Sequence, residues 1–589
     1  MSRSESLGAT LTAPNRTEFR VWAPFRDKVS IEIVAPSSLT VPMVRNEAGY
    51  HEAFVDVGAG ARYLYLLDGV ARPDPASRSQ PEGVHGPSEV VGSEFEWHDA
   101  GWRGIALTDF VIYELHVGTF TEEGTFDAAI GKLDALRELG ITAVELMPVA
   151  QFPGTRNWGY DGAYIGAPQN SYGGPAGLKR LVDAAHQRGL AVVLDVVYNH
   201  LGPEGNYIRE FGPYFTTRYK TPWGDALNFD GPHSDDVRWF FVHNALMWAG
   251  EYHIDALRVD AVHAIVDHSA QPFLQDLTTA VRERARELSR RIHTLAESDL
   301  NDPRVIAPRE SFGLGFDAQW SDDLHHTLHA LLTGEQSGYY RGFGKASDLA
   351  RVFREGYFYS GQFSPYRGRR YGLKPENPDG AQFVVCAQNH DQIGNRMRGE
   401  RLTVLVSREQ QRLAAAVVIF SPFLPLFFMG EEYGETAPFQ YFTSHSDAEL
   451  IEAVRRGRRE EFREFEWTGE FPDPHAEATF VRSRLTWNEE RGRREFYRTL
   501  LRLRREHPAL RSHDMAALET HADDARRLLL VRRWSGGDQV LLAFNFGDQT
   551  TTMQIPFAPA AWEALFETEA AMEGNSLRLP PSSFALYGA

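Results

Sequence analysis

Residues 178–200 read LKRLVDAAHQRGLAVVLDVVYNH. Apolar residues recur at helical spacing between Leu178 and Ala185, and Gly189 is the kind of residue that ends a helix. The apolar run from Leu190 to Val197 follows at once and predicts a strand that is buried on both faces. Because a helix leads directly into a buried strand, this stretch indicates one unit of a parallel α/β fold.

The same alternation of apolar strand and amphipathic helix continues on both sides of this unit. A further helical stripe begins at Phe126 and ends before Gly140. Strand candidates occur at residues 110–115, 142–147, 190–197, 255–260, 291–297, 315–320, 382–387 and 423–429. Eight strands separated by helices predict an α/β fold of the (β/α)8 TIM barrel type, in which functional residues lie at the carboxyl ends of the strands.

The segments outside the predicted barrel alternate with the period of a β-strand. Residues 29–33 alternate apolar and polar, and residues 63–67 lead into the turn Asp68-Gly69, so this region predicts a small antiparallel sandwich. Alternating segments also follow the barrel region, from Leu528 to Trp534 and from Val540 to Phe546, and predict a second sandwich. The predicted domains are an N-terminal β-sandwich over residues 1–96, a linker or ordered crossing over 97–108, the barrel over 109–489, and a helix leading into a C-terminal β-sandwich over 490–589.

The overall charge and composition narrow the classes of partner. The chain has 589 residues and a net charge of −19, so it lacks the basic surface that nucleic acids or anionic membranes require. Cys386 is the single cysteine, which excludes an intramolecular disulfide and is typical of a reducing compartment. Residues 1–14 lack the apolar core of a signal peptide, and no apolar run reaches the roughly 18 residues of a membrane span. We therefore predict a cytoplasmic protein, monomeric or homodimeric, whose ligand is neutral, as a sugar is.

Polar residues collect where the predicted strands end. A lone Asp at a strand end is more often a loop cap or an ion-pair partner than a catalytic residue. Here, however, several strand ends carry carboxylates in the register that a barrel would bring to one edge. The sequences at these ends are DVVYNH (195–200), RVD (258–260), AESD (296–299) and QNHD (388–391).

Two of these carboxylates fit the chemistry of glycosidic bond cleavage. Cleavage with retention of configuration needs an ionised and a protonated carboxyl group about 5–5.5 Å apart. Asp260 and Glu297 end consecutive predicted strands, which allows that separation. Arg258 precedes Asp260 by two residues, points to the same side of its strand and keeps Asp260 ionised. Glu297 needs the reverse, a raised pKa, and the pattern therefore predicts a retaining glycosidase.

The four strand-end segments resemble the conserved regions of the α-amylase family of glycoside hydrolases and transglycosidases, over residues 109–480. The resemblance implies that Asp260 is the nucleophile, Glu297 the general acid/base and Asp391 the stabiliser of the transition state. Family members with a sandwich before the barrel mostly act on branched or modified α-glucans, so the N-terminal sandwich is expected to be similar to glucan-binding domains. The resemblance also implies a −1 subsite lined by Tyr160, His200, Arg258 and His390, with Asp195 as a structural neighbour.

Longer segments are similar to one group within that family, the hydrolases that release trehalose. These segments are residues 157–162, 198–207, 221–224, 296–303 and 388–395. The similarity implies hydrolysis of the α-1,4 bond next to the terminal trehalose of a maltooligosyltrehalose, which yields trehalose and a maltooligosaccharide. Two alternatives remain open here: a glycogen branching enzyme, which would use the same carboxylates for transglycosylation, and a non-catalytic glucan-binding protein.

The chain departs from the amylase pattern at two places. Many amylases carry a Lys-His pair where this chain has His263-Ala264, so contacts on the leaving-group side are not carried over. Asn199 is a calcium ligand in many amylases, but the loop that would supply its partners is not recognisable, so no metal and no cofactor are predicted. We predict instead that His263, Trp223 and Asp299 contact the leaving-group side of the substrate.

Several of these residues also have a purely structural interpretation. Tyr160 and Trp158 could cover the mouth of the barrel, and His200 and His390 could be core histidines with satisfied hydrogen bonds. Four residues could be either loop scaffolding or contacts to the leaving group, namely Asp299, Asn301, Trp223 and Glu204.

Overall fold

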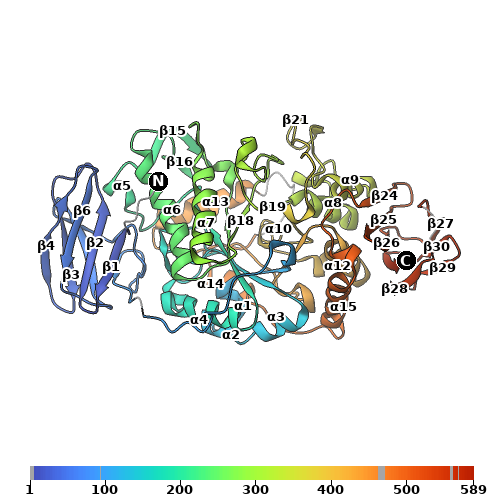
Figure 1. The fold of residues 1–589 in the computed structure, drawn as a ribbon, viewed down its shortest axis with the longest axis horizontal. Helices are drawn as coiled ribbons and strands as arrows, with labels where there is room; N and C mark the ends of the chain where they lie inside the picture. Colours follow the sequence, from blue (N-terminus) through green and yellow to red (C-terminus); the bar gives the residue numbers. More distant parts are fainter. Residues whose placement is uncertain (1–5, 93, 462–470, 558–560, 568) are drawn as a thin grey trace.

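The computed structural model describes residues 6–92, 94–461, 471–557, 561–567 and 569–589. Its centre is a closed barrel of parallel strands in the order β10-β11-β14-β17-β18-β19-β22-β23 (Figure 1). The strands are β10 Ile112–Leu115, β11 Ala143–Leu146, β14 Ala191–Val196, β17 Ala256–Val259, β18 His293–Ala296, β19 Ala318–Trp320, β22 Phe383–Cys386 and β23 Leu424–Phe428. Each lies inside one of the ranges predicted from the sequence, so the (β/α)8 barrel is confirmed.

Helices follow the barrel strands and bury their apolar faces. The stripe that begins at Phe126 forms two short helices, α2 Phe126–Ile130 and α3 Leu133–Leu139. Helix α3 ends at Gly140, whose φ of 110° is a left-handed conformation that glycine adopts without strain. The other principal helices are α4 Gly174–Gln187, α6 Ser234–Glu251, α7 Phe273–Leu288, α8 Asp322–Thr333, α9 Ala346–Glu355, α12 Arg408–Phe420, α13 Ala448–Glu461 and α15 Arg493–Glu506.

The interior of the barrel changes character along its axis. Near the amino ends of the strands it is filled by small and apolar side chains such as Ala143, Ala191 and Ala256. Nearer the carboxyl ends, Glu114 stands opposite Glu145 in the strand register, and Asp195 stands opposite Arg258. Charged side chains are therefore concentrated at one end of the barrel.

Antiparallel sheets lie on opposite sides of the barrel, as predicted, the N-terminal sheets to the left and the C-terminal sheets to the right in Figure 1. Four strands form one N-terminal sheet: β1 Gly8–Ala13, β2 Arg16–Trp22, β6 Tyr50–Val55 and β5 Val44–Arg45. Five strands form the other: β4 Leu39–Pro42, β3 Val29–Ala35, β7 Arg62–Leu67, β8 Val70–Arg72 and β9 Ser88–Glu89. The larger C-terminal sheet contains β24 Leu518–Asp523, β25 Leu528–Ser535, β26 Asp538–Asn545, β31 Ser583–Gly588 and β28 Glu563–Glu567, and the smaller contains β27 Thr551–Gln554, β30 Ser576–Leu579 and β29 Ala571–Glu573.

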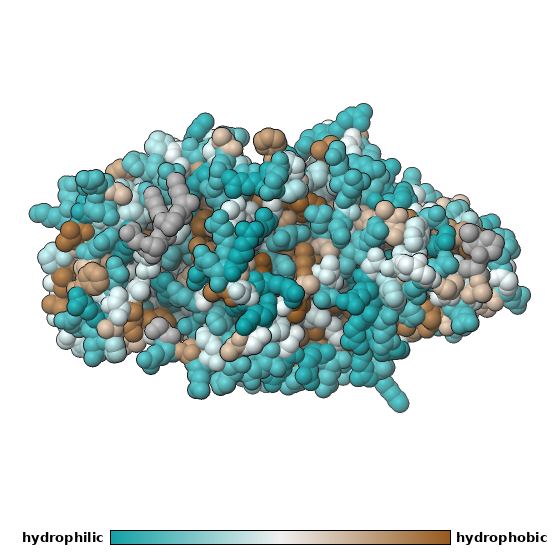
Figure 2. Space-filling view, viewed as in Figure 1, coloured by the Kyte–Doolittle hydropathy of each residue, from teal (hydrophilic) through white to brown (hydrophobic). Residues whose placement is uncertain are grey.

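The surface is mostly hydrophilic on the face that Figure 2 shows, with apolar residues scattered over it and more of them at the N-terminal end. The N-terminal strands carry exposed Leu39, Val44 and Phe54. Among the described residues, no helix has both the length and the apolar character needed to span a membrane.

The segment that connects the N-terminal sheets to the barrel packs against the amino end of the barrel. Trp102 Nε1 donates a hydrogen bond to Asp255 Oδ1 at 2.7 Å, directly before β17. Asp255 also accepts from His186 Nε2 at 2.8 Å and from Arg290 Nη2 at 3.0 Å. Burial favours the neutral acid, but the hydrogen bond and charge of His186, together with Arg290, outweigh it and hold the pKa of Asp255 below its ordinary value.

This arrangement leads to a stability prediction. Asp255→Ala leaves the buried side chains of His186 and Arg290 without their shared carboxylate, so we expect a loss of about 3–5 kcal/mol. Because the pKa is lowered by folding, the contribution is present at neutral pH and is lost as pH falls through the folded-state value. The midpoint of thermal unfolding at pH 7 measures the loss. Asp109→Ala, which removes the exposed partner of Arg511, is the control and should leave the midpoint unchanged.

Candidate active site

The carboxyl ends of the barrel strands bring the predicted residues into one polar site around Arg258. The Arg258 side chain is fully buried, and its Nη1 lies 2.6 Å from Asp260 Oδ1 and 2.9 Å from Asp195 Oδ2. Its Nη2 lies 3.9 Å from Glu297 Oε2. A single guanidinium therefore faces the carboxylates that follow β17 and β18, and it brings Asp260 and Glu297 into one cluster.

Asp260 is held in its ionised form. Burial is the largest influence and favours the neutral acid. It is outweighed by the charges of Arg258 and His200 and by the hydrogen bond from Asn199 Nδ2, which lies 2.7 Å from Asp260 Oδ2. The pKa of Asp260 therefore lies below its ordinary value, as a nucleophile requires.

The pKa of Glu297 is shifted in the opposite direction, upward. Burial is again the largest influence, and the negative charges of Asp260 and Asp391 act in the same direction, so the pKa of Glu297 is raised despite Arg258 and His263. Its Oε2 accepts a hydrogen bond of 2.6 Å from the backbone N–H of Ala261. Ala261 has a φ of 39°, a strained left-handed conformation that aims this N–H at Glu297.

Asp391 lies on the open side of the site. It belongs to the short helix α10 His390–Gly394, which follows β22 and has Asn389 as its N-cap. The Asp391 backbone N–H donates to Asn389 Oδ1 at 2.9 Å, and the side chain is 44% exposed, more than that of Asp260 or Glu297. Its carboxylate is therefore available to a ligand.

Tyr160 and His390 lie beside these carboxylates. The Tyr160 hydroxyl donates to Asp195 Oδ2 at 2.7 Å and lies 2.8 Å from His390 Nε2, and the two rings stack with centroids 5.4 Å apart. His390 Nδ1 lies 2.5 Å from Glu114 Oε1. Burial disfavours a charged imidazole, but the charges of Glu114 and Asp391 raise the pKa of His390 to about 9. His390 is therefore an imidazolium at neutral pH, with its partners fixed on both nitrogens.

The residues predicted to contact the leaving-group side lie in two pairs, one of which includes His200 of the predicted −1 subsite. Trp223 lies at the turn of the hairpin β15 Phe215–Thr221 and β16 Gly224–Leu227, and its ring stacks on His200 at 4.5 Å with an interplanar angle of 4°. The Trp223 side chain is about half exposed. His263 Nε2 lies 3.7 Å from Asp299 Oδ1. These four residues, which are separate in the sequence, form two pairs beside the carboxylates.

Three further candidates have structural partners instead. Asn301 Nδ2 donates to Asp323 Oδ2 at 2.7 Å. Glu204 is buried and accepts from the backbone N–H of Ser446 at 3.0 Å. Trp158 is buried and its Nε1 donates to the backbone oxygen of residue 440 at 2.9 Å. These contacts support the interpretation of Asn301, Glu204 and Trp158 as scaffolding.

The sequence did not single out several residues that the structure places in the site. Glu114, the partner of His390, had a visible signal, since it is a charged residue within an apolar strand. Arg367 Nη2 donates to Asp299 Oδ2 at 2.7 Å but comes from a distant loop with no local signal. Asp322, at the start of α8, accepts from Gln392 Nε2 at 3.2 Å. Burial and the charges of surrounding carboxylates raise the pKa of Asp322 to about 8.

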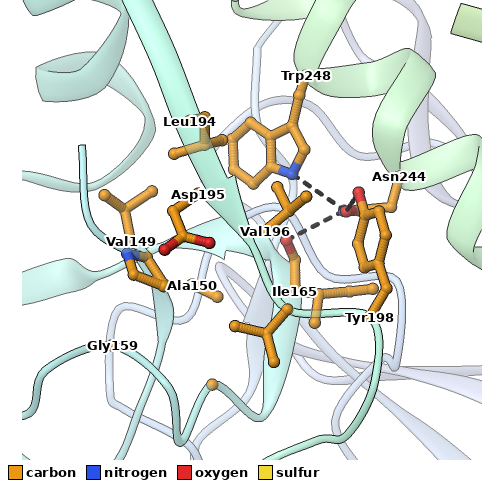
Figure 3. Close-up of a pocket in the computed structure, with 13 residues that line it drawn as sticks. Val149, Ala150, Gly159, Ile165, Leu194, Asp195, Val196, Tyr198, Asn244 and Trp248 are labelled. Atoms are coloured by element: carbon orange, nitrogen blue, oxygen red, sulfur yellow. Dashed lines mark hydrogen bonds between the residues drawn. The ribbon is translucent and has the colours of Figure 1, made fainter. Parts of the chain in front are cut away.

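A small cavity beside β14 adjoins this polar cluster and shares Asp195 with it (Figure 3). It lies between β14, the segment that follows β11 and helix α6. Asn244 Oδ1 accepts from the Tyr198 hydroxyl at 2.7 Å and from Trp248 Nε1 at 3.1 Å. Asp195 supplies the cavity's one carboxylate, which is already bound to Arg258 and Tyr160. We therefore regard the open polar site around Arg258, and not this cavity, as the candidate active site. Within the described ranges, no group of three or more His, Cys, Asp or Glu is arranged to hold a metal ion.

Known proteins are similar to this chain over most of its length. The sequence profile of the alpha amylase catalytic domain matches residues 95–243, and that of DUF3459, a domain of unknown function, matches residues 516–586. The malto-oligosyltrehalose trehalohydrolase of Saccharolobus solfataricus is 49% identical over 83% of this chain and 85% of its own length. The enzyme of the same name from Rhizobium sp. (strain M-11) is 46% identical over 92% of each chain. The crystal structure of an alpha amylase-type protein from Salmonella typhimurium is 39% identical, with a TM-score of 0.91 over 99% of this chain and 100% of that one.

Proposed function

The chain belongs to the malto-oligosyltrehalose trehalohydrolases of the α-amylase family, and we propose that Asp260, Glu297 and Asp391 perform its reaction. It is a glycoside hydrolase that acts on maltooligosyltrehalose and releases trehalose and a maltooligosaccharide. The observation that carries the assignment of residues is the pair Asp260 and Glu297, which share one guanidinium yet have pKa values shifted in opposite directions.

These two protonation states fit a two-step mechanism with retention. Asp260 attacks the anomeric carbon while Glu297 protonates the glycosidic oxygen, and trehalose leaves. Glu297, now ionised, then takes a proton from water, and the resulting nucleophile cleaves the glucosyl–Asp260 ester. Asp391 stabilises the positive charge that develops on the sugar ring in both steps. His390 and Tyr160 would contact the same sugar from the other side.

Maltotriosyltrehalose is the substrate that tests this function. We expect trehalose and maltotriose as products, with the α configuration of the new reducing end observed by NMR before mutarotation. A change in iodine staining of amylose without new reducing ends would indicate a branching enzyme instead, and random internal cleavage would indicate an ordinary amylase. Binding without any cleavage would indicate a glucan-binding protein.

The opposite pKa shifts predict the pH dependence of kcat/KM. Activity requires ionised Asp260 and protonated Glu297, so we expect a bell-shaped profile with its acid limb below 3.8 and its alkaline limb above 4.5, the ordinary values of the two groups. Since the charge of Asp391 helps to raise the pKa of Glu297, Asp391→Asn should move the alkaline limb to lower pH. An alkaline limb that stays in place in this variant would contradict the assignment of Glu297 as the titrating acid.

Trp223 is expected to contact substrate because its half-exposed ring already stacks on His200. Trp223→Ala should raise KM for maltotriosyltrehalose by about 3-fold to 10-fold, with little change in kcat, since an aromatic contact of this kind contributes about 0.5–1.5 kcal/mol. Trp534→Ala, which removes a partly exposed ring from β25 of the C-terminal sheet, is the matched control. An unchanged KM in Trp223→Ala would assign this ring to packing of the hairpin.

We also propose that the protein acts in the cytoplasm as a monomer or homodimer. The single cysteine, which is typical of a reducing compartment, supports the location. Light scattering of the purified protein tests the oligomeric state, and fractionation of the source cells tests the location.

A further inference from the structure

Glu145 is a buried carboxyl group for which the reaction gives no role. It lies on β11, faces the barrel interior and has no solvent exposure. Neither carboxyl oxygen has a hydrogen-bond partner within the part of the chain that the structure describes. An ionised carboxylate left in this state would cost several kcal/mol, because both oxygens would lose their hydration without replacement.

No positively charged group is bound to Glu145 within the described residues. The charged groups that face it are Glu114 on β10, Asp195 on β14, Arg258 on β17 and His390 on α10. Arg258 binds Asp195 and Asp260 through Nη1, and its Nε and Nη2 donate a hydrogen bond to no group in the described residues, Glu145 included. His390 is bound to Glu114. The two cations are therefore engaged by other carboxylates, and the residue opposite Glu145 in the strand register, Glu114, is itself an acid.

A shared proton resolves this conflict. We propose that Glu145 is held as a carboxylic acid that donates its proton to the Glu114 carboxylate, and that it thereby positions His390. Adjacent parallel strands lie about 4.7–4.9 Å apart, which lets register-paired carboxyl groups on one face meet. Two carboxyl groups that share a site do not both ionise. Burial, together with the charge of Glu114, raises the pKa of Glu145, which supports the same protonation state.

Glu114 links the protonated Glu145 to His390 in the substrate site. One Glu114 oxygen lies 2.5 Å from His390 Nδ1 and the other accepts from the His390 backbone N–H at 3.1 Å. A proton from Glu145 would hold the Glu114 carboxylate in the orientation that makes both contacts. His390 in turn contacts Tyr160 and lies 3.5 Å from Asp391 Oδ1. Glu145 is therefore a positioning residue, and its effect on turnover rests on the proposed function of the site.

Two substitutions test whether Glu145 acts as a hydrogen-bond donor or only fills space in the barrel. Glu145→Gln keeps a donor N–H of similar reach, so kcat/KM should stay within about threefold of wild type. Glu145→Leu keeps similar volume without a donor, so kcat should fall by about 10-fold to 100-fold with KM little changed. Thermal unfolding checks that both variants fold. Equal impairment of the two variants, or full activity of both, would overturn the proposal.

Spectroscopy tests the protonation state without any substrate, so its outcome is independent of the proposed reaction. The infrared difference between wild type and Glu145→Gln at neutral pH should contain the C=O band of a protonated carboxylic acid, shifted in D2O. A difference that contains only ionised-carboxylate bands would overturn the proposal. In ¹⁵N-histidine NMR spectra, the His390 signals should be retained in Glu145→Gln and displaced in Glu145→Leu. Unmoved signals in Glu145→Leu would show that Glu145 does not position His390.

Discussion

Asp260→Asn is expected to lower kcat by at least about 10⁴-fold while the chain still folds and binds substrate. The amide has nearly the shape of the carboxylate, but it cannot attack the anomeric carbon or stabilise positive charge there. Arg258 keeps Asp195 as an ionic partner in this variant, so the guanidinium is not left without a bound carboxylate. Release of trehalose from maltotriosyltrehalose measures kcat, and calorimetric titration of the same oligosaccharide measures binding.

Chemical rescue distinguishes a lost nucleophile from a distorted site. Asp260→Ala opens space on the face of the sugar that Asp260 would attack, so added azide should restore part of the turnover. The product expected is the β-linked maltooligosyl azide, because azide replaces the first displacement and no second one follows. Asp134→Asn, which changes a surface carboxylate paired with Arg188, is the control and should behave as wild type. A variant at Asp260 that retains hydrolysis would refute its role as nucleophile.

The fold was predictable because its determinants are local and repeated. Each barrel strand is a short apolar run, and runs such as residues 190–197 are bounded by glycine on one side and by polar residues on the other. Helix ends such as Gly140 also follow from one residue's backbone preference. Strand bounds were predicted one to three residues too long at several ends. Some flanking residues, such as Phe110 and Phe423, share the apolar character of the strand without pairing in the sheet, whereas others, such as Asp317, are polar.

The sequence predicted the site residues that follow barrel strands. It did not predict the contacts that loops make. Asp260 and Glu297 meet because the strand register brings the ends of β17 and β18 together. Arg367 meets Asp299 only through the path of a long loop, which no local pattern reveals. The stacking of Trp223 on His200 likewise depends on where a hairpin folds back. The catalytic roles themselves stay predictions until variants are measured.

Arg258 accounts for the different protonation states of two acids in one buried cluster. Its Nη1 lies at 2.6 Å from Asp260 and its Nη2 at 3.9 Å from Glu297, so the stabilisation of negative charge is unequal. Asp260 receives, in addition, a hydrogen bond from Asn199. Glu297 receives one from Ala261 but faces two other carboxylates. Burial therefore dominates at Glu297 and is overcome at Asp260, as the division of roles requires.

Glu297→Gln is expected to lower kcat on maltotriosyltrehalose by about 10²–10⁴-fold, because both the leaving trehalose and the attacking water lose their proton carrier. The size of the effect should depend on the leaving group. An aryl maltooligoside with an acidic phenol needs no proton to depart, so its first step should proceed at nearly the wild-type rate. The second step still lacks a base, and the glucosyl–Asp260 ester should accumulate. Mass spectrometry of the intact protein and of its peptides would identify this ester on Asp260.

Azide provides a complementary test of Glu297. In Glu297→Gln the nucleophile is intact, so azide would intercept the covalent intermediate and yield an α-linked maltooligosyl azide, the opposite anomer to that from Asp260→Ala. Opposite anomers from the two variants can arise only if one residue is the nucleophile and the other the acid/base. Asp322→Asn serves as the comparison, because it removes another acid whose pKa is raised, to about 8, in the same site. If Asp322→Asn accumulated the ester and Glu297→Gln did not, the acid/base role would belong to Asp322.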